Sequence, residues 1–254
     1  MVLEKRLIMK RIFVVTYFLF NTIVGFSQKT TVYCIGDSTM ANKANPKENP
    51  EHGWAQVLGE FFDERVTIDN RALNGRSSKS FISEGRWDSV VKTLAPGDFV
   101  FIQFENNDQK FKDSTRYTNP HISYRHNLIY FIKQTREQGA TPLLFSSIVR
   151  RNFNEFGNLI DTHGQYTLET RLVAHEMKVL FIDLQYLTEK LEIAHGVEGS
   201  RDLHLHFSPG ENPYYPDGKE DDTHLSRKGA LLIAEMVIKE IQTMGLSLAE
   251  YIKL

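Results

Sequence analysis

A serine near the start of the chain and an Asp-x-x-His motif near its end are the residues best suited to chemistry. Ser38 follows the apolar run Thr31–Ile35, and Asp221 and His224 lie about 180 residues later. A serine hydroxyl is a weak nucleophile at neutral pH, and it is activated when an imidazole takes its proton and a carboxylate orients that imidazole. The chain order Ser, Asp, His is one of several that produce this geometry. The sequence therefore predicts Ser38 as a nucleophile, His224 as its base and Asp221 as the residue that orients the base.

Two further polar segments follow apolar runs and could complete such a site. Gly75 lies in Asn-Gly-Arg-Ser-Ser after the run 66–70, and Asn107 lies in Glu-Asn-Asn-Asp after the run 98–104. Glycine lets a backbone N–H approach a substrate closely, and an asparagine side chain can donate a hydrogen bond to a developing oxyanion. The alternative for both segments is a plain turn, which Asn-Gly and Asx residues also favour.

These residues need a scaffold, and the pattern of the chain indicates an α/β fold. Helical periodicity at about 54–62, 121–138, 165–178 and 226–244 alternates with short apolar runs at 31–35, 66–70, 98–104, 142–148 and 179–184. This alternation predicts a three-layer α/β/α sandwich with a parallel sheet of about five strands, whose functional residues gather at the carboxyl ends of the strands. We expect residues 195–222 to form one long irregular segment, which in a compact domain is usually functional.

Composition excludes several classes of protein. The chain has 254 residues, 41% of them hydrophobic, and a net charge of −2, so we expect no nucleic-acid partner. Its one cysteine, Cys34, lies in an apolar run, where it is expected to be a buried thiol without a disulfide partner. His204 and His206 alternate in sequence but lack a carboxylate at metal-ligand spacing. We therefore expect neither a metal site nor a cofactor.

The N-terminal segment predicts export. Basic residues at positions 5, 6, 10 and 11 precede the apolar stretch 12–26, and small residues stand before Gln28. This pattern is typical of a signal peptide over residues 1–27, which leaves a single domain over 28–254 in a secreted or periplasmic protein. Removing four basic residues and one acidic residue takes the net charge from −2 to about −5. The alternative is an uncleaved membrane anchor, although the stretch is short for a bilayer span.

The motifs taken together resemble those of the SGNH (GDSL-like) hydrolase superfamily, and most closely its rhamnogalacturonan acetylesterase group. The resemblance covers residues 30–243. It rests on Tyr33-Cys34-Ile35-Gly36-Asp37-Ser38-Thr39, Asn74-Gly75-Arg76-Ser77-Ser78-Lys79-Ser80-Phe81, Glu84-Gly85-Arg86-Trp87, Arg150-Arg151-Asn152-Phe153, Asp161-Thr162-His163-Gly164 and Asp222-Thr223-His224. It implies a flavodoxin-like sheet and hydrolysis through an acyl-enzyme without a metal ion or cofactor.

The family's site residues transfer to matching positions of this chain. The resemblance implies that the nucleophile is Ser38, that the base is His224 and that Asp221 orients it. The oxyanion donors would be the backbone N–H groups of Ser38 and Gly75 and the side chain of Asn107. Asp222 is less suited to orient the base than Asp221. It stands two residues before the histidine, whereas the family's aspartate stands three residues before it.

One position departs from the family pattern. Where the family usually reads Gly-His-Asn-Asp, this chain has Glu105 in place of the glycine. If the position requires a positive φ angle, glutamate strains it. If it only requires a small residue, Glu105 places a charge at the pocket, where it would oppose the oxyanion and raise the pKa of His224.

The resemblance implies a serine esterase that removes O-acetyl groups from a plant cell-wall polysaccharide such as pectin or rhamnogalacturonan. Candidate substrate contacts are Asp37 and Arg76, which neighbour Ser38 and Gly75, and Tyr214 and Tyr215, whose rings could pack on sugars. We expect an acetylated polysaccharide or oligosaccharide as partner and no stable membrane association after signal cleavage. One alternative is an SGNH lipase or thioesterase on another acyl ester. The other is a non-catalytic carbohydrate-binding relative.

Overall fold

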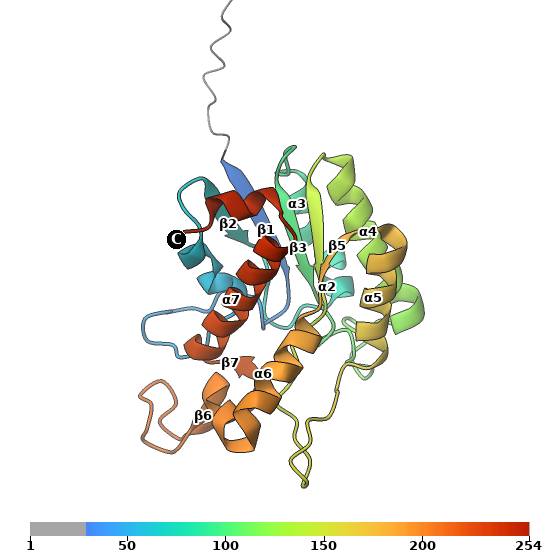
Figure 1. Cartoon of the computed structure of the whole chain (residues 1–254). Helices are drawn as coiled ribbons and strands as arrows, with labels where there is room; N and C mark the ends of the chain where they lie inside the picture. Colours follow the sequence, from blue (N-terminus) through green and yellow to red (C-terminus); the bar gives the residue numbers. More distant parts are fainter. Residues whose placement is uncertain (1–28, 254) are drawn as a thin grey trace, which may run out of the picture.

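The computed structural model describes residues 29–253, and a five-stranded parallel sheet forms its centre (Figure 1). The strands lie in the order β2-β1-β3-β4-β5. All four neighbouring pairs are parallel. The strands are β1 (Thr30–Gly36), β2 (Val66–Asn70), β3 (Phe99–Gln103), β4 (Thr141–Phe145) and β5 (Leu180–Ile182). The predicted α/β fold with about five parallel strands is confirmed, and each apolar run in the sequence overlaps one strand.

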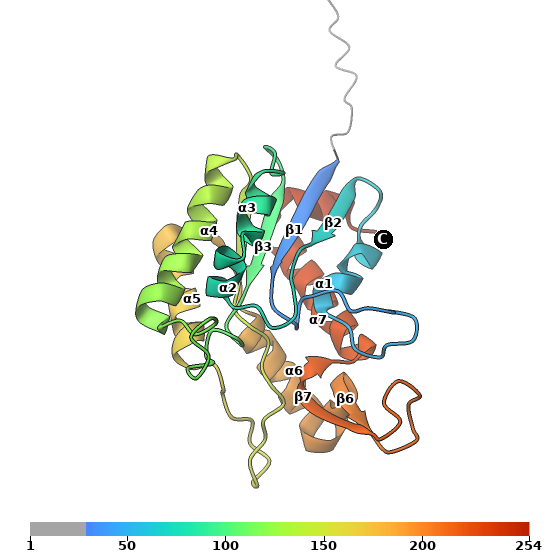
Figure 2. The ribbon, with the colours of Figure 1, turned by 180° about the vertical axis from the view of Figure 1, so that it is seen from behind.

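Helices cover both faces of the sheet (Figures 1 and 2), and side chains that alternate along the strands pack against them in two hydrophobic clusters. Cys34 and Phe101 belong to the hydrophobic cluster that includes α1 (Trp54–Val57) and α7 (Arg227–Thr243). Their chain neighbours Ile35 and Ile102 belong to a second cluster on the other face. The helices there are α2 (Ser78–Ser83), α3 (Arg86–Val91), α4 (Arg125–Glu137) and α5 (Gln165–Met177). Burial on both faces explains why the strands are continuously apolar.

The predicted helices are present with shifted bounds. The stripe at 54–62 is a short α-helix, α1, that continues as a 3-10 helix over Leu58–Phe61. The segment 121–138 is a π-turn over Pro120–Tyr124 followed by α4. Helix α7 begins after Ser226, whose hydroxyl accepts the N–H of Gly229 at 3.1 Å. A Cβ atom on Gly229 would lie 2.1 Å from the carbonyl oxygen of Leu203, so only glycine lets this turn pack there.

The prediction of one long irregular segment over 195–222 is wrong. Helix α6 (Leu184–Gly199) and a 3-10 helix (Ser200–Leu203) occupy its beginning, and an antiparallel hairpin of β6 (His204–Phe207) and β7 (Lys219–Leu225) contains most of the rest. Apart from a kink at Gly196 inside α6, where φ is 68°, only the connection between the two hairpin strands is irregular.

The strand order reverses direction at β1, because the chain moves from β1 to β2 on one side and to β3 on the other. A crevice forms beyond the carboxyl ends of the strands at such a switch point. Ser38 follows β1 and Asn107 follows β3, so both come to this place.

The signal peptide predicted over residues 1–27 lies outside the described residues. Among residues 29–253, no helix has both the length and the apolar composition needed to cross a membrane.

Candidate active site

Ser38, His224 and Asp221 form a continuous chain of hydrogen bonds. The Oγ of Ser38 lies 2.9 Å from Nε2 of His224. The other ring nitrogen of His224, Nδ1, lies 2.9 Å from Oδ2 of Asp221. With Nδ1–H donating to the carboxylate, Nε2 is the acceptor for the serine proton. The arrangement can generate an alkoxide-like serine and hold the imidazolium that results.

The local turn that joins Asp221 to His224 is a bulge in β7. His204 pairs with Leu225 and Leu205 pairs with Asp221, so residues 222–224 have no opposite residue on β6. Oδ1 of Asp221 closes this bulge by accepting the N–H groups of Thr223 at 3.0 Å and His224 at 2.9 Å. Burial disfavours the charged carboxylate, but the hydrogen bonds from the ring and backbone of His224 hold the pKa of Asp221 below its ordinary value. Asp221 is therefore an ionised orienting group at neutral pH.

Asp222 takes no part in this chain of hydrogen bonds. Its carboxylate accepts from Arg151 Nη1 and lies beside Nε2 of His206, both at 2.8 Å. The preference for Asp221 over Asp222 therefore matches the geometry. The neighbouring His204 is buried, with Nε2 2.9 Å from Oε1 of Glu192, so both histidines of β6 contact a carboxylate.

Three hydrogen-bond donors converge on the pocket that contains Ser38. Neither the backbone N–H of Ser38 nor that of Gly75 has an acceptor within residues 29–253. Gly75 has a φ angle of 76°, which favours glycine. The amide nitrogen of Asn107 donates one proton to the carbonyl of Arg76 at 3.2 Å, and its second proton remains for another acceptor. Arg116 fixes the orientation of this amide by donating to Oδ1 of Asn107 at 3.4 Å.

A buried lysine, which the sequence did not single out, joins the loops of the site. Nζ of Lys43 donates to the carbonyl of Ser38 at 2.6 Å and to Oδ1 of Asn74 at 2.7 Å, and it pairs with Glu51 at 2.8 Å. These three contacts use all three ammonium protons. Lys43 therefore fixes the turn of Ser38 against the loop of Gly75.

The pocket around Ser38 has a volume of about 530 Å³, and most of the residues that line it are of polar or charged types. Its walls consist of Ser38, Glu51, Asn74, Gly75, Asn106, Asn107, Lys110, Arg150, Lys219, Asp221, Thr223 and His224. Glu51, Lys110, Arg150 and Lys219 were not predicted as site residues. Arg150 lies in one of the motifs that carried the family resemblance, which was the available signal, but its role requires the fold.

The four predicted substrate contacts lie outside the lining of the Ser38 pocket. Asp37 is fully buried, and its carboxylate accepts from Thr39 and from Asn106. Arg76 pairs with Glu84 at 3.1 Å and lines a separate depression that shares Gly75 with the pocket.

Tyr214 and Tyr215 pack on one another, with ring centroids 5.2 Å apart, in the connection between β6 and β7. Tyr215 also stacks on Phe207 at 5.9 Å. Neither ring lines the Ser38 pocket, because this stacking holds them within the hairpin.

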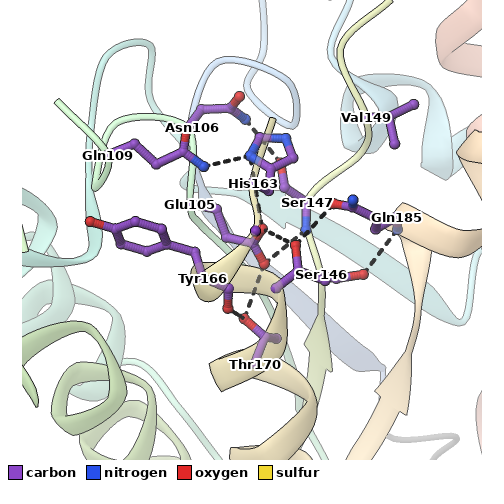
Figure 3. Close-up of polar contacts among 12 residues, drawn as sticks. Glu105, Asn106, Gln109, Ser146, Ser147, Val149, His163, Tyr166, Thr170 and Gln185 are labelled. Atoms are coloured by element: carbon purple, nitrogen blue, oxygen red, sulfur yellow. Dashed lines mark hydrogen bonds and ion pairs between the residues drawn. The ribbon is translucent and has the colours of Figure 1, made fainter. Parts of the chain in front are cut away.

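Glu105 has a φ angle of 123°, a region that costs a residue with a side chain roughly 1–3 kcal/mol. The alternative based on backbone strain is therefore correct. The alternative of a charge in the pocket is wrong, because the Glu105 side chain is fully buried and does not line the pocket. It extends toward Ser147 and Thr170, with His163 and Gln185 nearby (Figure 3).

Counting protons around the Glu105 carboxyl group indicates its charge. Oε2 lies 2.9 Å from the hydroxyl of Thr167, and that hydroxyl is also 2.9 Å from Oε1 of Gln185. The Gln185 oxygen is an acceptor, because the amide nitrogen of Gln185 donates to Asp161 and Glu189. One threonine proton cannot serve two acceptors. A protonated Glu105 removes this conflict by donating to Thr167.

Burial raises the pKa of Glu105 to about 8, in the same direction as the proton count. His163 does not supply a compensating charge, although its Nδ1 lies 4.0 Å from Oε2 of Glu105. Burial and the nearby Arg150 lower the pKa of His163 to about 4. Its two nitrogens contact Nε2 of Gln109 and the carbonyl of Ile148. Glu105 is thus a neutral acid at pH 7 that anchors the turn before Asn107.

Comparison with known proteins agrees with this geometry. Residues 34–232 match the model of the GDSL-like Lipase/Acylhydrolase family. The chain is 40% identical to the rhamnogalacturonan acetylesterase RhgT of Bacillus subtilis, over 87% of this chain and 93% of RhgT. It is 34% identical to the probable rhamnogalacturonan acetylesterase YesY of the same organism, over 87% of this chain and 96% of YesY.

A solved structure, the protein YXIM of Bacillus subtilis, superposes with a TM-score of 0.73 at 25% identity, over 86% of this chain and 58% of that longer chain. The match of the family model covers most of the described residues, including Ser38 and His224. The chain therefore belongs to the GDSL-like lipase/acylhydrolase family of carboxylic ester hydrolases.

Proposed function

We propose that this protein removes O-acetyl groups from a pectin-type polysaccharide by a serine mechanism. The observation that carries the proposal is the 2.9 Å contact between Ser38 Oγ and His224 Nε2, in a pocket where unused N–H donors converge. His224 takes the hydroxyl proton while Ser38 attacks the acetyl carbonyl carbon. The carbonyl oxygen becomes an oxyanion and accepts hydrogen bonds from the N–H groups of Ser38 and Gly75 and from Asn107.

Collapse of the tetrahedral intermediate breaks the ester bond to the sugar. His224 gives its proton to the departing sugar oxygen, and the acetyl group stays on Ser38. Water then gives a proton to His224 and attacks the acyl-enzyme, and acetate leaves as the Ser38 hydroxyl is restored. Asp221 remains ionised and stabilises the imidazolium in both halves of the reaction.

The substrate class is supported by the relatives and by the pocket. The two most similar relatives named above are described as a rhamnogalacturonan acetylesterase and a probable one. The pocket lining contains two acidic and three basic side chains besides His224, together with asparagines, which suits a hydroxyl-rich sugar. A lipase or thioesterase site would favour an apolar cleft for its acyl chain. Hydrolysis of short and long acyl nitrophenyl esters separates these activities, and we expect a preference for acetyl.

A non-catalytic role is disfavoured by the placement of Glu105. Its carboxyl group lies behind the pocket rather than in it, so the substitution does not obstruct Ser38. We expect a fluorophosphonate probe to label Ser38, whereas an inactive binding protein would remain unlabelled.

The decisive experiment measures acetate released from acetylated pectin fragments. Ser38→Ala should reduce kcat by at least 10³-fold, because it removes the nucleophile. Ser208→Ala, at an exposed serine in the connection between β6 and β7, is the control and should match the wild type. Undiminished acetate release by Ser38→Ala would exclude the mechanism.

Localisation follows as a further part of this proposal. An acetylated cell-wall polysaccharide is an extracellular substrate, and the N-terminal pattern of basic and apolar residues is that of a signal peptide. We infer a secreted or periplasmic enzyme that acts on polysaccharide or its oligosaccharide fragments.

A further inference from the structure

The pocket around Ser38 carries more positive than negative charge. Both acidic side chains in its lining already have basic partners within residues 29–253. Glu51 pairs with Lys43 at 2.8 Å, and Asp221 contacts His224 at 2.9 Å and Lys219 at 3.5 Å. The other two basic side chains in the lining, Lys110 and Arg150, belong to none of these pairs.

Arg150 and Lys110 have no carboxylate partner in the part of the chain that the structure describes. Neither forms an ion pair within 4.0 Å there, and the Arg150 guanidinium donates only to the amide oxygen of Gln109, at 3.3 Å. Burial lowers the pKa of Arg150, although the more distant Asp37 acts in the opposite direction. Burial and repulsion from Arg116 and Arg150 lower the pKa of Lys110. The two cations thus lie in an environment that an added anion would stabilise.

The chemistry of the two side chains selects the kind of anion. A guanidinium presents a planar fork of N–H donors that matches the two oxygens of a carboxylate, and most of this fork is unused in Arg150. A neutral sugar would leave the half-buried charge uncompensated. We propose that Arg150, assisted by Lys110, forms a subsite for the carboxylate of a uronic acid residue of the substrate. The proposal deepens the function proposed above and rests on it.

The position of the subsite gives it a direct part in specificity. Arg150 and Ser38 line the same pocket of about 530 Å³, so the recognised carboxylate belongs to the acetylated sugar or to a sugar near it. Recognition of this carboxylate would orient the acetyl ester toward Ser38. The enzyme would then prefer acidic pectin over neutral acetylated polysaccharides.

The test compares acetylated galacturonate-containing oligosaccharides with the same material after methyl esterification of its carboxylates. For the wild type, kcat/KM should be about 10-fold higher on the free acid, which corresponds to about 1.4 kcal/mol, since a charged pair forms stronger hydrogen bonds than a neutral one. Arg150→Gln should reduce this preference to less than about 2-fold, and Arg150→Lys should give an intermediate value because it keeps the charge but loses the fork. Lys239→Gln makes the same change in net charge at an exposed position on α7 and should retain the wild-type preference.

A second measurement separates this proposal from the function on which it rests. Unacetylated galacturonide oligosaccharides should inhibit hydrolysis of nitrophenyl acetate competitively, with an inhibition constant about 10-fold higher for Arg150→Gln. If the wild type releases acetate equally from both forms of the substrate, or if Arg150→Gln keeps the preference, the subsite is wrong and the deacetylase function stands. If no acetate is released from either form, the proposed function is wrong, and the inhibition constants decide the carboxylate subsite.

Discussion

Glu105 combines an unfavourable backbone conformation with a fully bonded side chain. Its positive φ angle favours glycine, but its carboxyl group contacts the N–H of Ser147 and the hydroxyls of Thr167 and Thr170 at 2.9 to 3.2 Å. These contacts tie the turn that follows β3 to β4 and α5. The side chain thereby offsets part of the strain, and Asn107, two residues later, is held toward the pocket.

The protonation of Glu105 predicts a pH dependence of stability. Its pKa rises from 4.5 to about 8 on folding, so between these values the folded state keeps a proton that the unfolded state has lost. Its contribution to stability is therefore complete below about pH 4.5 and decreases as pH rises to about 8. Relative to Glu105→Gln, the wild type should lose roughly 3 kcal/mol of unfolding free energy between pH 5 and 8. Urea unfolding of both proteins at several pH values measures this difference.

Comparing the wild type with Glu105→Gln separates the effect of Glu105 on stability from the effects of other buried titratable groups. The pKa of Asp108 is raised to about 7, so Asp108 also makes the unfolding free energy fall as pH rises. The pKa of His163 is lowered to about 4, so His163 makes the unfolding free energy increase with pH. Both are present in wild type and variant, so the pH dependence that each causes on its own is common to the two profiles. The difference between the profiles reports Glu105 together with its interaction with Asp108, whose charge raises the pKa of Glu105. Glu64→Gln, at an exposed acid, is the control. Parallel pH profiles for wild type and Glu105→Gln would mean that Glu105 is ionised at neutral pH.

Residue types in the sequence identified the reacting groups better than the substrate contacts. Ser38, Asp221 and His224 could be chosen because nucleophile, base and orienting group have few alternatives. Asp37 and Arg76 were expected at the substrate, but their partners come from residues whose proximity only the fold determines. Arg150 was missed for the same reason, since its unpaired charge depends on which acids surround it.

The bulge in β7 is the element that presents Asp221 and His224 to the pocket. In a regular strand, residues three apart point to opposite faces. The unpaired residues 222–224 remove this restriction, and Oδ1 of Asp221 stabilises the bulge through two backbone N–H groups. The Asp221 carboxylate therefore shapes the backbone and orients the imidazole at the same time.

This double role predicts different effects for two adjacent aspartates. Asp221→Asn should lower kcat on acetate esters by about 10³- to 10⁴-fold, because an amide neither fixes the Nδ1–H tautomer nor stabilises the imidazolium. Asp222→Asn should lower kcat by less than about 3-fold, since Asp222 contacts Arg151 and His206 on the other side of the hairpin. Steady-state kinetics of the two variants measures the contrast. Similar losses in both would show that the charge of the hairpin, rather than the Asp221–His224 contact, supports activity.

Helix α6, one of the elements that the sequence analysis missed, has a polar buried face. Helix α6 buries Gln185, Thr188 and Glu192 at positions where a periodic pattern requires apolar residues. The hydroxyl of Thr188 donates to a backbone carbonyl, and Glu192 contacts the buried His204 of β6. These compensations are contacts between distant residues, so hydrophobic periodicity does not reveal them. The strands of the central sheet were predicted because their burial is apolar on both faces.

At the scale of the molecule, the two hydrophobic clusters and the switch point of the sheet place the site. Ser38 follows the first strand and His224 belongs to the hairpin before the last long helix, yet they meet at the carboxyl edge of one sheet. Gly229 lets α7 pack on the carbonyl of Leu203, directly before β6, and the N–H of Ser226, directly after β7, donates to the same carbonyl, so the position of the hairpin that carries His224 depends on packing outside the pocket. The catalytic geometry is therefore a property of the whole domain.

The N-terminal pattern predicts a signal peptide over residues 1–27, which is removed when the protein is exported. Within residues 29–253, the hydrophobic clusters begin at Val32 and Tyr33, and the residues proposed for the site begin at Ser38. A chain that begins at Gln28 should therefore have the same kcat as a chain that also carries residues 1–27, and a Tm within about 2 °C of it, which corresponds to less than about 1 kcal/mol. Mass spectrometry of the protein exported by bacterial cells should give Gln28 as its first residue, because the small residues before it form the predicted cleavage site. Recovery of the full-length chain from the membrane fraction would instead support the anchor.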